Sequence, residues 1–382
     1  MIEINYELKL AEIFSINPKE FSSFEVLDPF NNNFLLEGAI CRRADYRYGA
    51  LGIFAINGEP TEQIIYATPK LHYPFDKNGK YLWAPLTNLK IFNKLDGTNI
   101  TAIHYEFEGR DFVTYKTRLT PTLIDGRFGS FLSMWIEYLQ KNVWVEKVIS
   151  AYPNYNLSFE MYGSRNPILV KYDVSLEVAL LFGVDRKTAE IVPPNYLNSP
   201  DVKIPFKFDF TGEDQTQIYK QARIKMSQKI QSYEGEGFPL EGMVFYGKNS
   251  DGWKMFKCKS EEIEKIHWAA GGISRNAIFT TCVNAYESYP EPTIENVITL
   301  LKEEFSEEQI GKGQIRIGIV FEEVAKHMVM VKLVNDIWKL ANEAGFDITK
   351  DKAGTLRFVS KYFKKQEMRK VGTIILKQAN LI

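Results

Sequence analysis

In the stretch Leu89-Lys90-Ile91-Phe92-Asn93-Lys94-Leu95-Asp96-Gly97-Thr98-Asn99, side chains alternate between two faces, as in a β-strand, and the alternation ends at Lys94. Asp96-Gly97, which begins two residues later, is a strong turn signal. A second alternating pattern runs from Asn99 to Phe107. We therefore expect two strands within residues 84–118, joined by a tight turn, with Lys94 at the end of the first.

Further strand patterns lie on both sides of this stretch, and the chain after residue 262 has a different character. Helical spacing of apolar residues predicts one helix over 129–150, and a polar helix is expected over 215–233. Strands are expected at 35–56 (with turns), 62–68, 156–161, 176–184, 235–245 and 253–259, a loop at 191–210, and helices at 274–288, 293–305, 315–344 and 353–368. These patterns predict an α+β unit followed by a helical unit.

The composition of the 382-residue chain narrows the classes of protein to consider. Hydrophobic residues make up 45% of the chain, which is enough for a large core. Because the net charge is -1, any binding of nucleic acid must depend on local positive patches. The three cysteines and four histidines show no close ligand spacing, which argues against a disulfide framework and a zinc site. No apolar run is long enough to cross a membrane, so we expect a cytoplasmic protein without membrane contact.

Three further segments place charged residues at the ends of predicted strands. Glu160 lies in Ser158-Phe159-Glu160-Met161-Tyr162-Gly163, and Glu241 lies in Pro239-Leu240-Glu241-Gly242-Met243-Val244-Phe245. Lys257 and Lys259 alternate on one face of Trp253-Lys254-Met255-Phe256-Lys257-Cys258-Lys259. Taken singly, each segment is better explained as the solvated end or edge of a strand.

Together and in this order, these segments resemble the covalent nucleotidyltransferase superfamily of ATP-dependent ligases and mRNA capping enzymes. The sequence KLDGTN at 94–99 is similar to the nucleophile motif, and SFEMYG, EGMVF and FKCK are similar to three further motifs. Ala179–Asp185 resembles the strand that supplies an aromatic residue to the base, and Thr117-Arg118 resembles the basic motif after the nucleophile. The resemblance covers about 66 to 260.

The resemblance implies a role for each matching residue and a fold for the chain. Lys94 would be the nucleophile, with Asp96, Glu241, Lys257 and Lys259 in the catalytic set, Glu241 as the metal ligand, and Gly97, Arg118, Glu160, Phe182, Lys257 and Lys259 beside the nucleotide. The implied fold is a nucleotidyltransferase catalytic domain of ATP-grasp-like antiparallel sheets at 81–262, with an N-terminal β-rich module at 1–80 and an α-helical C-terminal domain at 263–382.

The implied chemistry requires an uncharged lysine amine, whereas a free lysine is mostly protonated at pH 7. We expect Lys257, Lys259 and a metal ion to lower the pKa of Lys94, because neighbouring positive charges disfavour its charged form. The cofactors implied are ATP and Mg²⁺, or Mn²⁺ in its place. Because Mg²⁺ sheds water reluctantly, it would keep some of its water ligands.

Within the superfamily, the helical pattern after residue 262 favours the ATP-dependent RNA ligase family, since DNA ligases and capping enzymes usually continue into a small β-barrel. Such an enzyme would adenylate a 5′-phosphate on RNA and join it to a 3′-hydroxyl, a reaction suited to RNA repair. The alternatives are an ATP-dependent DNA ligase, a capping guanylyltransferase, and a non-catalytic nucleic-acid-binding protein with a relic site.

The C-terminal residues leave two questions open. Arg357, Lys361 and Lys364 would share one face of the helix expected at 353–368, either as a solvated face or as a surface for RNA phosphates. The aliphatic run Ile315–Leu333 would bury against the catalytic unit or against a second copy, so a homodimer through these helices is one alternative.

Overall fold

The computed structural model divides the chain into two compact units. The first comprises Met1–Ile124 and Leu132–Ala269, and the second comprises Asp125–Phe131 and Ala270–Ile382. The boundary predicted at residue 262 lies outside the described residues. The described residues are 5–76, 80–125, 130–166, 170–233, 239–260, 273, 275–289, 291–302, 305, 307–364 and 367–378.

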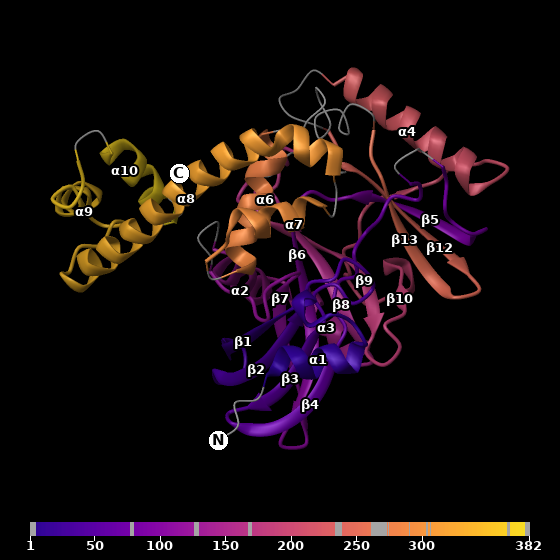
Figure 1. Cartoon of the computed structure of the whole chain (residues 1–382), viewed down its shortest axis with the longest axis horizontal. Coiled ribbons are helices and arrows are strands. Elements are labelled where there is room, and N and C mark those ends of the chain that lie inside the picture. Colours follow the sequence, from indigo (N-terminus) through magenta and orange to yellow (C-terminus); the bar gives the residue numbers. More distant parts are fainter. Residues whose placement is uncertain are drawn as a thin grey trace. The chain divides into compact units, whose positions relative to one another are not determined.

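The first unit is built on three antiparallel sheets, and the regular elements described in the second are helices (Figure 1). This confirms the predicted α+β class with antiparallel sheets followed by helices. The N-terminal sheet has the strand order β1-β2-β3-β4. Its elements are α1 (Tyr6–Phe14), a short 3₁₀ helix (Pro18–Glu20), β1 (Phe21–Asp28), β2 (Phe34–Cys41), β3 (Leu51–Ile56) and β4 (Glu59–Ile65).

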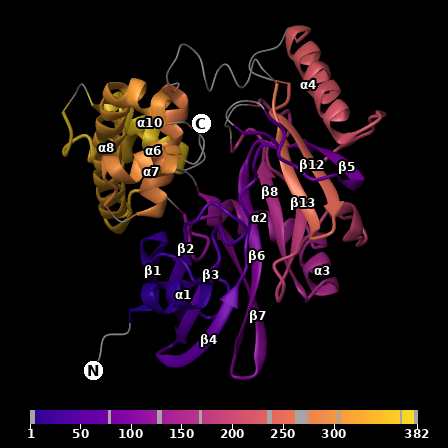
Figure 2. The same cartoon turned by 45° about the vertical axis from the view of Figure 1, so that its right-hand side comes forward.

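Helix α1 packs beside the N-terminal sheet and was not predicted (Figure 2). It has only nine residues, too few to give a clear helical period, and the Asn5 side chain caps it by accepting from the Leu8 amide. Leu10 and Phe14 are buried against Phe21 and other sheet residues. The helix therefore forms through tertiary packing and a cap more than through its own pattern.

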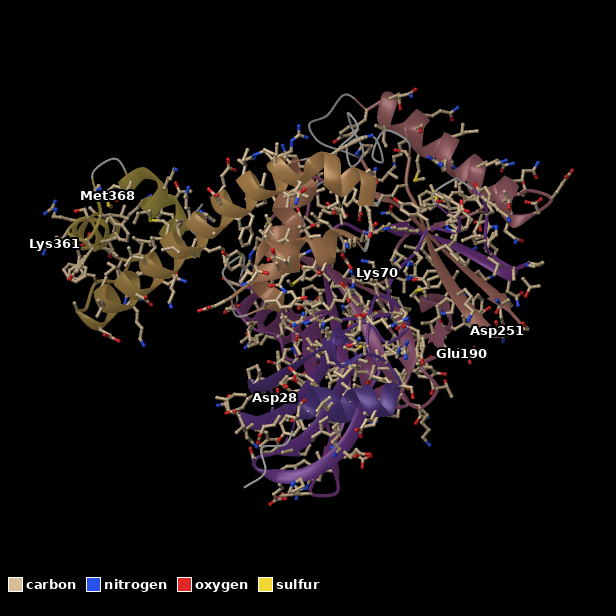
Figure 3. All side chains as sticks on the ribbon, viewed as in Figure 1. Asp28, Lys70, Glu190, Asp251, Lys361 and Met368 are labelled. Atoms are coloured by element: carbon tan, nitrogen blue, oxygen red, sulfur yellow. The ribbon has the colours of Figure 1, made fainter. Side chains whose placement is uncertain are left out.

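Asp28, labelled in Figure 3, connects the N-terminal sheet to the second sheet. Its buried carboxylate accepts hydrogen bonds from the Tyr105 hydroxyl at 2.8 Å and the Thr114 hydroxyl at 2.7 Å. The Asn31 amide group also donates to the Val113 carbonyl at 2.8 Å. Because a buried carboxylate is costly unless its oxygens are satisfied, these bonds fix the two sheets against each other.

The second sheet has five strands in the order β10-β9-β8-β6-β7. Two helices pack on it. The ring centroid of Phe159 in the sheet lies 5.8 Å from that of Trp135 and 6.0 Å from that of Trp144. The single helix predicted over 129–150 was wrong, because Asn142 ends the first helix by donating from its side chain to the Tyr138 carbonyl. The elements are β6 (Thr98–Phe107), β7 (Arg110–Thr117), α2 (Phe131–Lys141), α3 (Trp144–Ala151), β8 (Tyr155–Tyr162), β9 (Glu177–Asp185) and β10 (Ile191–Val192).

The third sheet has the order β11-β5-β12-β13 and carries helix α4 on one face. Tyr219, Ala222 and Met226 of α4 are buried against Ile91 and Phe245 of the sheet. The elements are β5 (Thr87–Lys94), a 3₁₀ turn (Pro194–Tyr196), β11 (Lys207–Phe208), α4 (Gln215–Gln231), β12 (Gly242–Asn249) and β13 (Gly252–Cys258). Part of the loop predicted at 191–210 thus forms two short edge strands.

The Asp96-Gly97 step is a passage between sheets and not the hairpin turn that the sequence suggested. Strand β5 pairs with β11 and β12, whereas β6 pairs with β7 and β8. A Cβ on Gly97 would lie 2.3 Å from the Met161 carbonyl oxygen, so the chain passes too close to β8 for any side chain there.

The second unit contains α6 (Arg275–Ser288), α7 (Ile294–Lys302), α8 (Glu307–Glu343), α9 (Lys352–Val359) and α10 (Met368–Gln378). None of the helices in the described ranges combines the length and the apolar character needed to cross a bilayer. Helix α8 begins earlier than predicted, at Glu307.

The shared basic helix face predicted for Arg357, Lys361 and Lys364 was wrong. Helix α9 ends at Val359, and Ser360 forms its C-cap, so only Arg357 of the three is helical. Beyond the cap the Lys361 amide bonds to the carbonyl three residues back, which is a turn, and Lys361 is labelled in Figure 3. The physical reason is Ser360, whose amide donates to the Leu356 carbonyl and whose hydroxyl donates to the Arg357 carbonyl at 2.8 Å, which closes the last turn of the helix.

Candidate active site

The pairing of three strands brings Lys94, Glu241 and Lys259 to one end of the third sheet. Lys94 is the last residue of β5 and lies opposite Gly242, the first residue of β12. Glu241 directly precedes β12, and Lys259 directly follows β13. Residues far apart in the sequence therefore meet because two antiparallel pairings align the strand ends.

The Glu241 carboxylate bridges the two lysines. One oxygen, Oε2, pairs with the Nζ of Lys94, and the other, Oε1, lies 3.0 Å from the Nζ of Lys259. Burial tends to raise the pKa of Glu241, but the charges and hydrogen bonds of Lys94 and Lys259 outweigh it and lower the pKa to about 2. Glu241 is therefore ionised at any physiological pH.

The same ion pair raises the pKa of Lys94. Burial lowers the pKa, but the charges of Glu241, Glu160 and Asp96 and the hydrogen bond to Glu241 outweigh it, so the pKa is raised. Among the protein's own groups, the carboxylates outweigh Lys257 and Lys259 around the amine. The expected lowering of the pKa also included a metal ion, and with that ion it stays a prediction. While it is paired with Glu241, the Lys94 amine is protonated and cannot act as a nucleophile.

Glu160 supplies a second buried carboxylate, from the neighbouring sheet. It lies in β8 opposite Asn99 of β6 and is 8% exposed. Burial raises its pKa to about 7, in spite of the opposing charges of Lys94 and Arg118. Such a carboxylate gains and loses its proton near neutral pH, and it can accept hydrogen bonds from hydroxyl groups of a ligand.

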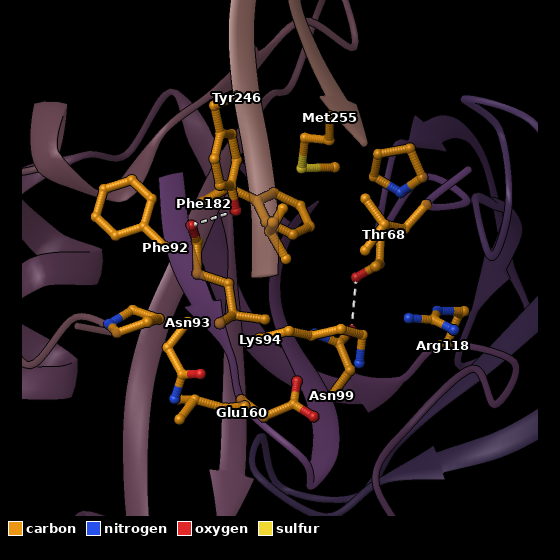
Figure 4. A pocket seen from close by; sticks show the side chains of 16 residues that line it. Thr68, Phe92, Asn93, Lys94, Asn99, Arg118, Glu160, Phe182, Tyr246 and Met255 are labelled. Atoms are coloured by element: carbon orange, nitrogen blue, oxygen red, sulfur yellow. Dashed lines mark hydrogen bonds between the residues drawn. The ribbon is translucent and has the colours of Figure 1, made fainter. Parts of the chain in front are cut away.

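A pocket lies between the second and third sheets, with Lys94 and Glu160 among the residues that line it (Figure 4). Apolar side chains make up much of its wall, as is typical of small-molecule sites. The lining residues are Thr68, Pro69, Leu71, Phe92, Asn93, Lys94, Leu95, Asn99, Arg118, Glu160, Leu181, Phe182, Pro205, Val244, Tyr246 and Met255.

Phe182 and Arg118 also line this pocket. The Phe182 ring is 4% exposed and belongs to a core cluster with Phe92 and Tyr246, whose hydroxyl donates to the Leu181 carbonyl at 3.1 Å. The Arg118 guanidinium carbon lies 5.8 Å from the centroid of the Tyr48 ring. The wall thus offers an aromatic face and a cation at separate positions.

Five of the residues predicted for the site are not among those that line the pocket: Asp96, Gly97, Glu241, Lys257 and Lys259. The Asp96 carboxylate accepts a hydrogen bond from the Val170 amide at 2.7 Å, and the Asp96 amide donates to the Tyr172 hydroxyl at 2.8 Å. The Nζ of Lys257 lies 4.5 Å from the centroid of the Tyr73 ring. Asp96 therefore fixes the segment after the nucleophile to the chain at 170–172.

Several side-chain contacts around the pocket were not predicted from the sequence. The Thr68 hydroxyl lies 2.7 Å from Oδ1 of Asn99 and 2.7 Å from the Thr101 hydroxyl, which ties the segment before the nucleophile to β6. Behind Arg118, the buried Lys116 donates to the carbonyls of Thr117 and Arg118 at 2.8 and 3.0 Å. The order of motifs gave no signal for these contacts, which depend on the folded positions of loops.

Whether the residues around the pocket can hold a metal ion depends on the carboxylate of Glu241. Among the residues that the structure describes, no group of three His, Cys, Asp or Glu side chains is placed to hold a metal ion together. Mg²⁺ typically takes one or two carboxylates and completes its shell with water and substrate phosphates. One ionised carboxylate beside the pocket matches that pattern, provided that Lys94 and Glu241 separate.

Comparisons with known proteins gave structural similarities only. No family model matches the chain, and no curated protein matches it. The chain is similar to a solved archaeal ATP-dependent RNA ligase, with 12% identity, a TM-score of 0.47, and coverage of 88% of this chain and 83% of that chain. The chain is also similar to a protein from Aquifex aeolicus that is provisionally described as an ATP-dependent DNA ligase. The identity is 14%, the TM-score is 0.43, and the match covers 82% of this chain and 76% of that chain.

A third solved structure, a Naegleria gruberi RNA ligase with pyrophosphate, has 13% identity and a TM-score of 0.33. The match covers 66% of this chain and 98% of that chain. Folds host unrelated activities, so the function of this chain must be argued from the residues of its site.

Proposed function

We propose that this chain is an ATP-dependent RNA ligase that joins 5′-phosphate and 3′-hydroxyl ends through a covalent AMP on Lys94. The observation that carries the proposal is the position of the Lys94 amine. It lies at a pocket between two sheets, beside the buried carboxylates of Glu241 and Glu160, with Phe182 in the wall. A nucleotide pocket that ends at a lysine amine is what covalent transfer of AMP to the protein requires.

In the proposed first step, the neutral amine of Lys94 attacks the α-phosphorus of ATP. A nitrogen–phosphorus bond forms, the bond to the β-phosphate oxygen breaks, pyrophosphate leaves with that electron pair, and the amine gives up a proton. Since Glu241 stabilises the charged amine, the ion pair must open before the attack. AMP then passes to the 5′-phosphate of the RNA, and attack by the 3′-hydroxyl releases it.

The other residues of the site are suited to holding the nucleotide. Glu160 can accept hydrogen bonds from ribose hydroxyls, the Phe182 ring can contact the base, and Arg118 can meet a phosphate or the ribose. Glu241 would hold Mg²⁺ or Mn²⁺, which when bound supplies neutralisation of phosphate charge. Lys259 remains close to the carboxylate as a fixed positive charge.

The preference for RNA is supported by the second unit. Every regular element that the structure describes between residues 273 and 378 is a helix. This favours an RNA ligase over a DNA ligase or a capping guanylyltransferase, in which a small β-barrel is expected to follow the catalytic unit.

Labelling with nucleotide tests the proposal directly. The purified chain is incubated with ATP or GTP and Mg²⁺, and its intact mass is measured. We expect a single AMP adduct with ATP that is lost in Lys94→Ala and retained in Lys90→Ala, a matched change on the same strand. A GTP-only adduct would indicate a guanylyltransferase, and no adduct with either nucleotide would indicate a relic site.

Joining is then assayed with 5′-labelled single-stranded RNA, nicked duplex RNA and nicked DNA. We expect ATP-dependent joining of at least one RNA substrate in preference to nicked DNA. Full adenylation of Lys94→Ala would contradict the assignment of the nucleophile.

A further inference from the structure

Residues 203–208, here called the strap, cross from the second sheet to the third along one side of the pocket. The Lys203 carbonyl accepts a hydrogen bond from the Leu180 amide at 2.7 Å, and the Phe206 carbonyl accepts one from the Asn93 amide at 2.8 Å. Between them, Pro205 lines the pocket. The strap therefore fixes Phe206 beside the residue that precedes Lys94.

Phe206 exposes a large aromatic surface at this position. Its side chain is 69% exposed, although the next residue in the strap begins a paired strand. The ring lies edge-on to Phe208, with 5.0 Å between centroids and 80° between planes, and Phe208 in turn lies 6.3 Å from Phe210. Residues at alternate positions share one side of an extended chain, so the three rings form a row that ends in the exposed one.

Helix α4 places positive charge beside this row. Its 17 residues include Lys220, Arg223, Lys225 and Lys229 and no acidic residue, although the whole chain has a net charge of -1. The Nζ of Lys225 lies 5.1 Å from the centroid of Phe210 and 5.9 Å from that of Phe208. Lys229 follows four residues later on the same helix face and is also exposed.

An acidic residue, Asp209, lies between Phe208 and Phe210 in the chain. It pairs with Lys207 at 2.6 Å, and both are exposed. The two charges of this pair oppose each other, and Lys225 and Lys229 add positive charge beside the rings. A surface that combines exposed aromatic area with positive charge fits a polynucleotide better than an apolar or acidic partner.

We propose that Phe206, Lys225 and Lys229 form a docking surface for single-stranded RNA, on which a base stacks against Phe206 and phosphates meet the two lysines. The inference rests on the proposed function and names the form of its polynucleotide substrate. An unpaired base offers a free face for stacking, whereas bases within a duplex already stack on each other. The strap holds this surface next to β5, the β-strand that ends at Lys94. A single-stranded RNA bound on the surface would therefore lead toward Lys94.

Binding of a 5′-phosphorylated, fluorescently labelled single-stranded 12-mer RNA to the full chain tests the surface. Fluorescence anisotropy is measured at several salt concentrations. Phe206→Ala is expected to weaken binding by about 5- to 100-fold, as for loss of one stacking contact, and Phe206→Trp is expected to retain it. Lys225→Gln and Lys229→Gln are each expected to weaken binding and to reduce the slope of log affinity against log salt by about 0.7.

Two variants of the same helix serve as matched controls. Lys220→Gln removes one charge at a position about 140° around the helix from Lys225. Ile224→Ala removes an apolar side chain that is 58% exposed and lies about 100° around the helix from Lys225. Both are expected to bind the RNA as the unchanged chain does, and thermal melting of every variant checks that folding is intact.

Equal binding by Phe206→Ala, Lys225→Gln and the controls would overturn the docking surface. An equal loss for a blunt RNA duplex in Phe206→Ala would overturn the single-stranded assignment. The proposed function is judged separately, by the AMP adduct on the unchanged chain. An adduct with unaltered RNA binding in the variants would reject only this surface, and absence of the adduct would reject the ligase whatever the RNA result.

Discussion

At the scale of the residue, the charge state of Lys94 depends on a single carboxylate. Glu241 contacts both Lys94 and Lys259, and its pKa is held at about 2. The order of motifs predicted that these residues would belong to one site. It could not predict that the carboxylates outweigh the lysines around the amine, because that balance depends on distances and burial that no motif contains.

Glu241→Gln is expected to lower the pKa of Lys94, because the largest opposing charge is removed while burial remains. The measurement is the pH dependence of acetylation of Lys94, followed by peptide mass spectrometry. We expect faster acetylation near pH 8 in the variant, with Lys326, an exposed lysine in the same digest, unchanged. An unaltered pH profile for Lys94 would show that Glu241 does not set its charge.

Lys116 is a second lysine whose charge depends on its surroundings. Burial, followed by the charges of Arg118 and Arg42, lowers its pKa to about 7. A neutral amine has two N–H groups, and the carbonyls of Thr117 and Arg118 accept two hydrogen bonds. Lys116 therefore needs no carboxylate to be satisfied when it is uncharged.

Between about pH 7 and the ordinary lysine value of about 10.4, the unfolded chain binds a proton at Lys116 that the folded chain does not. This group therefore adds stability as pH rises through that window, by at most about 1.4 kcal/mol per pH unit. The free energy of unfolding is measured in urea from pH 6 to pH 9. Relative to the unchanged chain, the stability of Lys116→Met is expected to decrease as pH rises. A constant difference at every pH would contradict this, and Lys326→Met is the control.

At the scale of the element, the sequence predicted the strands around the site better than their partners. The alternation in 84–118 predicted β5 and β6 but not β7 as a separate strand, and Asp96-Gly97 suggested a hairpin where the chain in fact changes sheets. Pairing is non-local, so local alternation cannot tell which strand will lie alongside. The end of α9 and the break between α2 and α3 were missed because Ser360 and Asn142 act through caps.

Gly97→Ala is expected to destabilise the chain by about 1–3 kcal/mol, as for overpacking, since the new Cβ would meet the Met161 carbonyl oxygen. Chemical denaturation measures the change. Gly311→Ala in α8 is the matched control, because its Cβ meets nothing within 4 Å, and a helical Gly-to-Ala change is expected to stabilise by up to about 1 kcal/mol. Equal stability for Gly97→Ala and the unchanged chain would show that β8 can shift.

At the scale of the whole molecule, every residue proposed for the site belongs to the first unit. The N-terminal sheet belongs there too, because Asp28 and a shared core that includes Leu36, Ile103 and Tyr105 join it to the second sheet. The division into an N-terminal module at 1–80 and a catalytic domain at 81–262 stays a prediction. Sequence patterns mark where strands begin and end, but not which sheets share a core.

A shortened chain of residues 1–269 is expected to fold and to form the AMP adduct on Lys94, because it keeps nearly all of the first unit. Circular dichroism melting and intact mass after incubation with ATP and Mg²⁺ are the measurements. A folded fragment that forms no adduct would mean that the second unit takes part in the first chemical step. RNA joining by the fragment, compared with the full chain, measures what the helices add to the later steps.

The passage at Gly97 has a mechanical consequence. Lys94 ends one sheet and Thr98 begins the other, so this covalent link between the two walls of the pocket, one of those that join them, is only three residues long. Lys94, which carries the attacking amine, is the residue that directly precedes this link. If the angle between the second and third sheets changed about this link, the side of the pocket far from the link would open for a ligand to enter. The Nζ of Lys94 would move much less, because it lies close to the link.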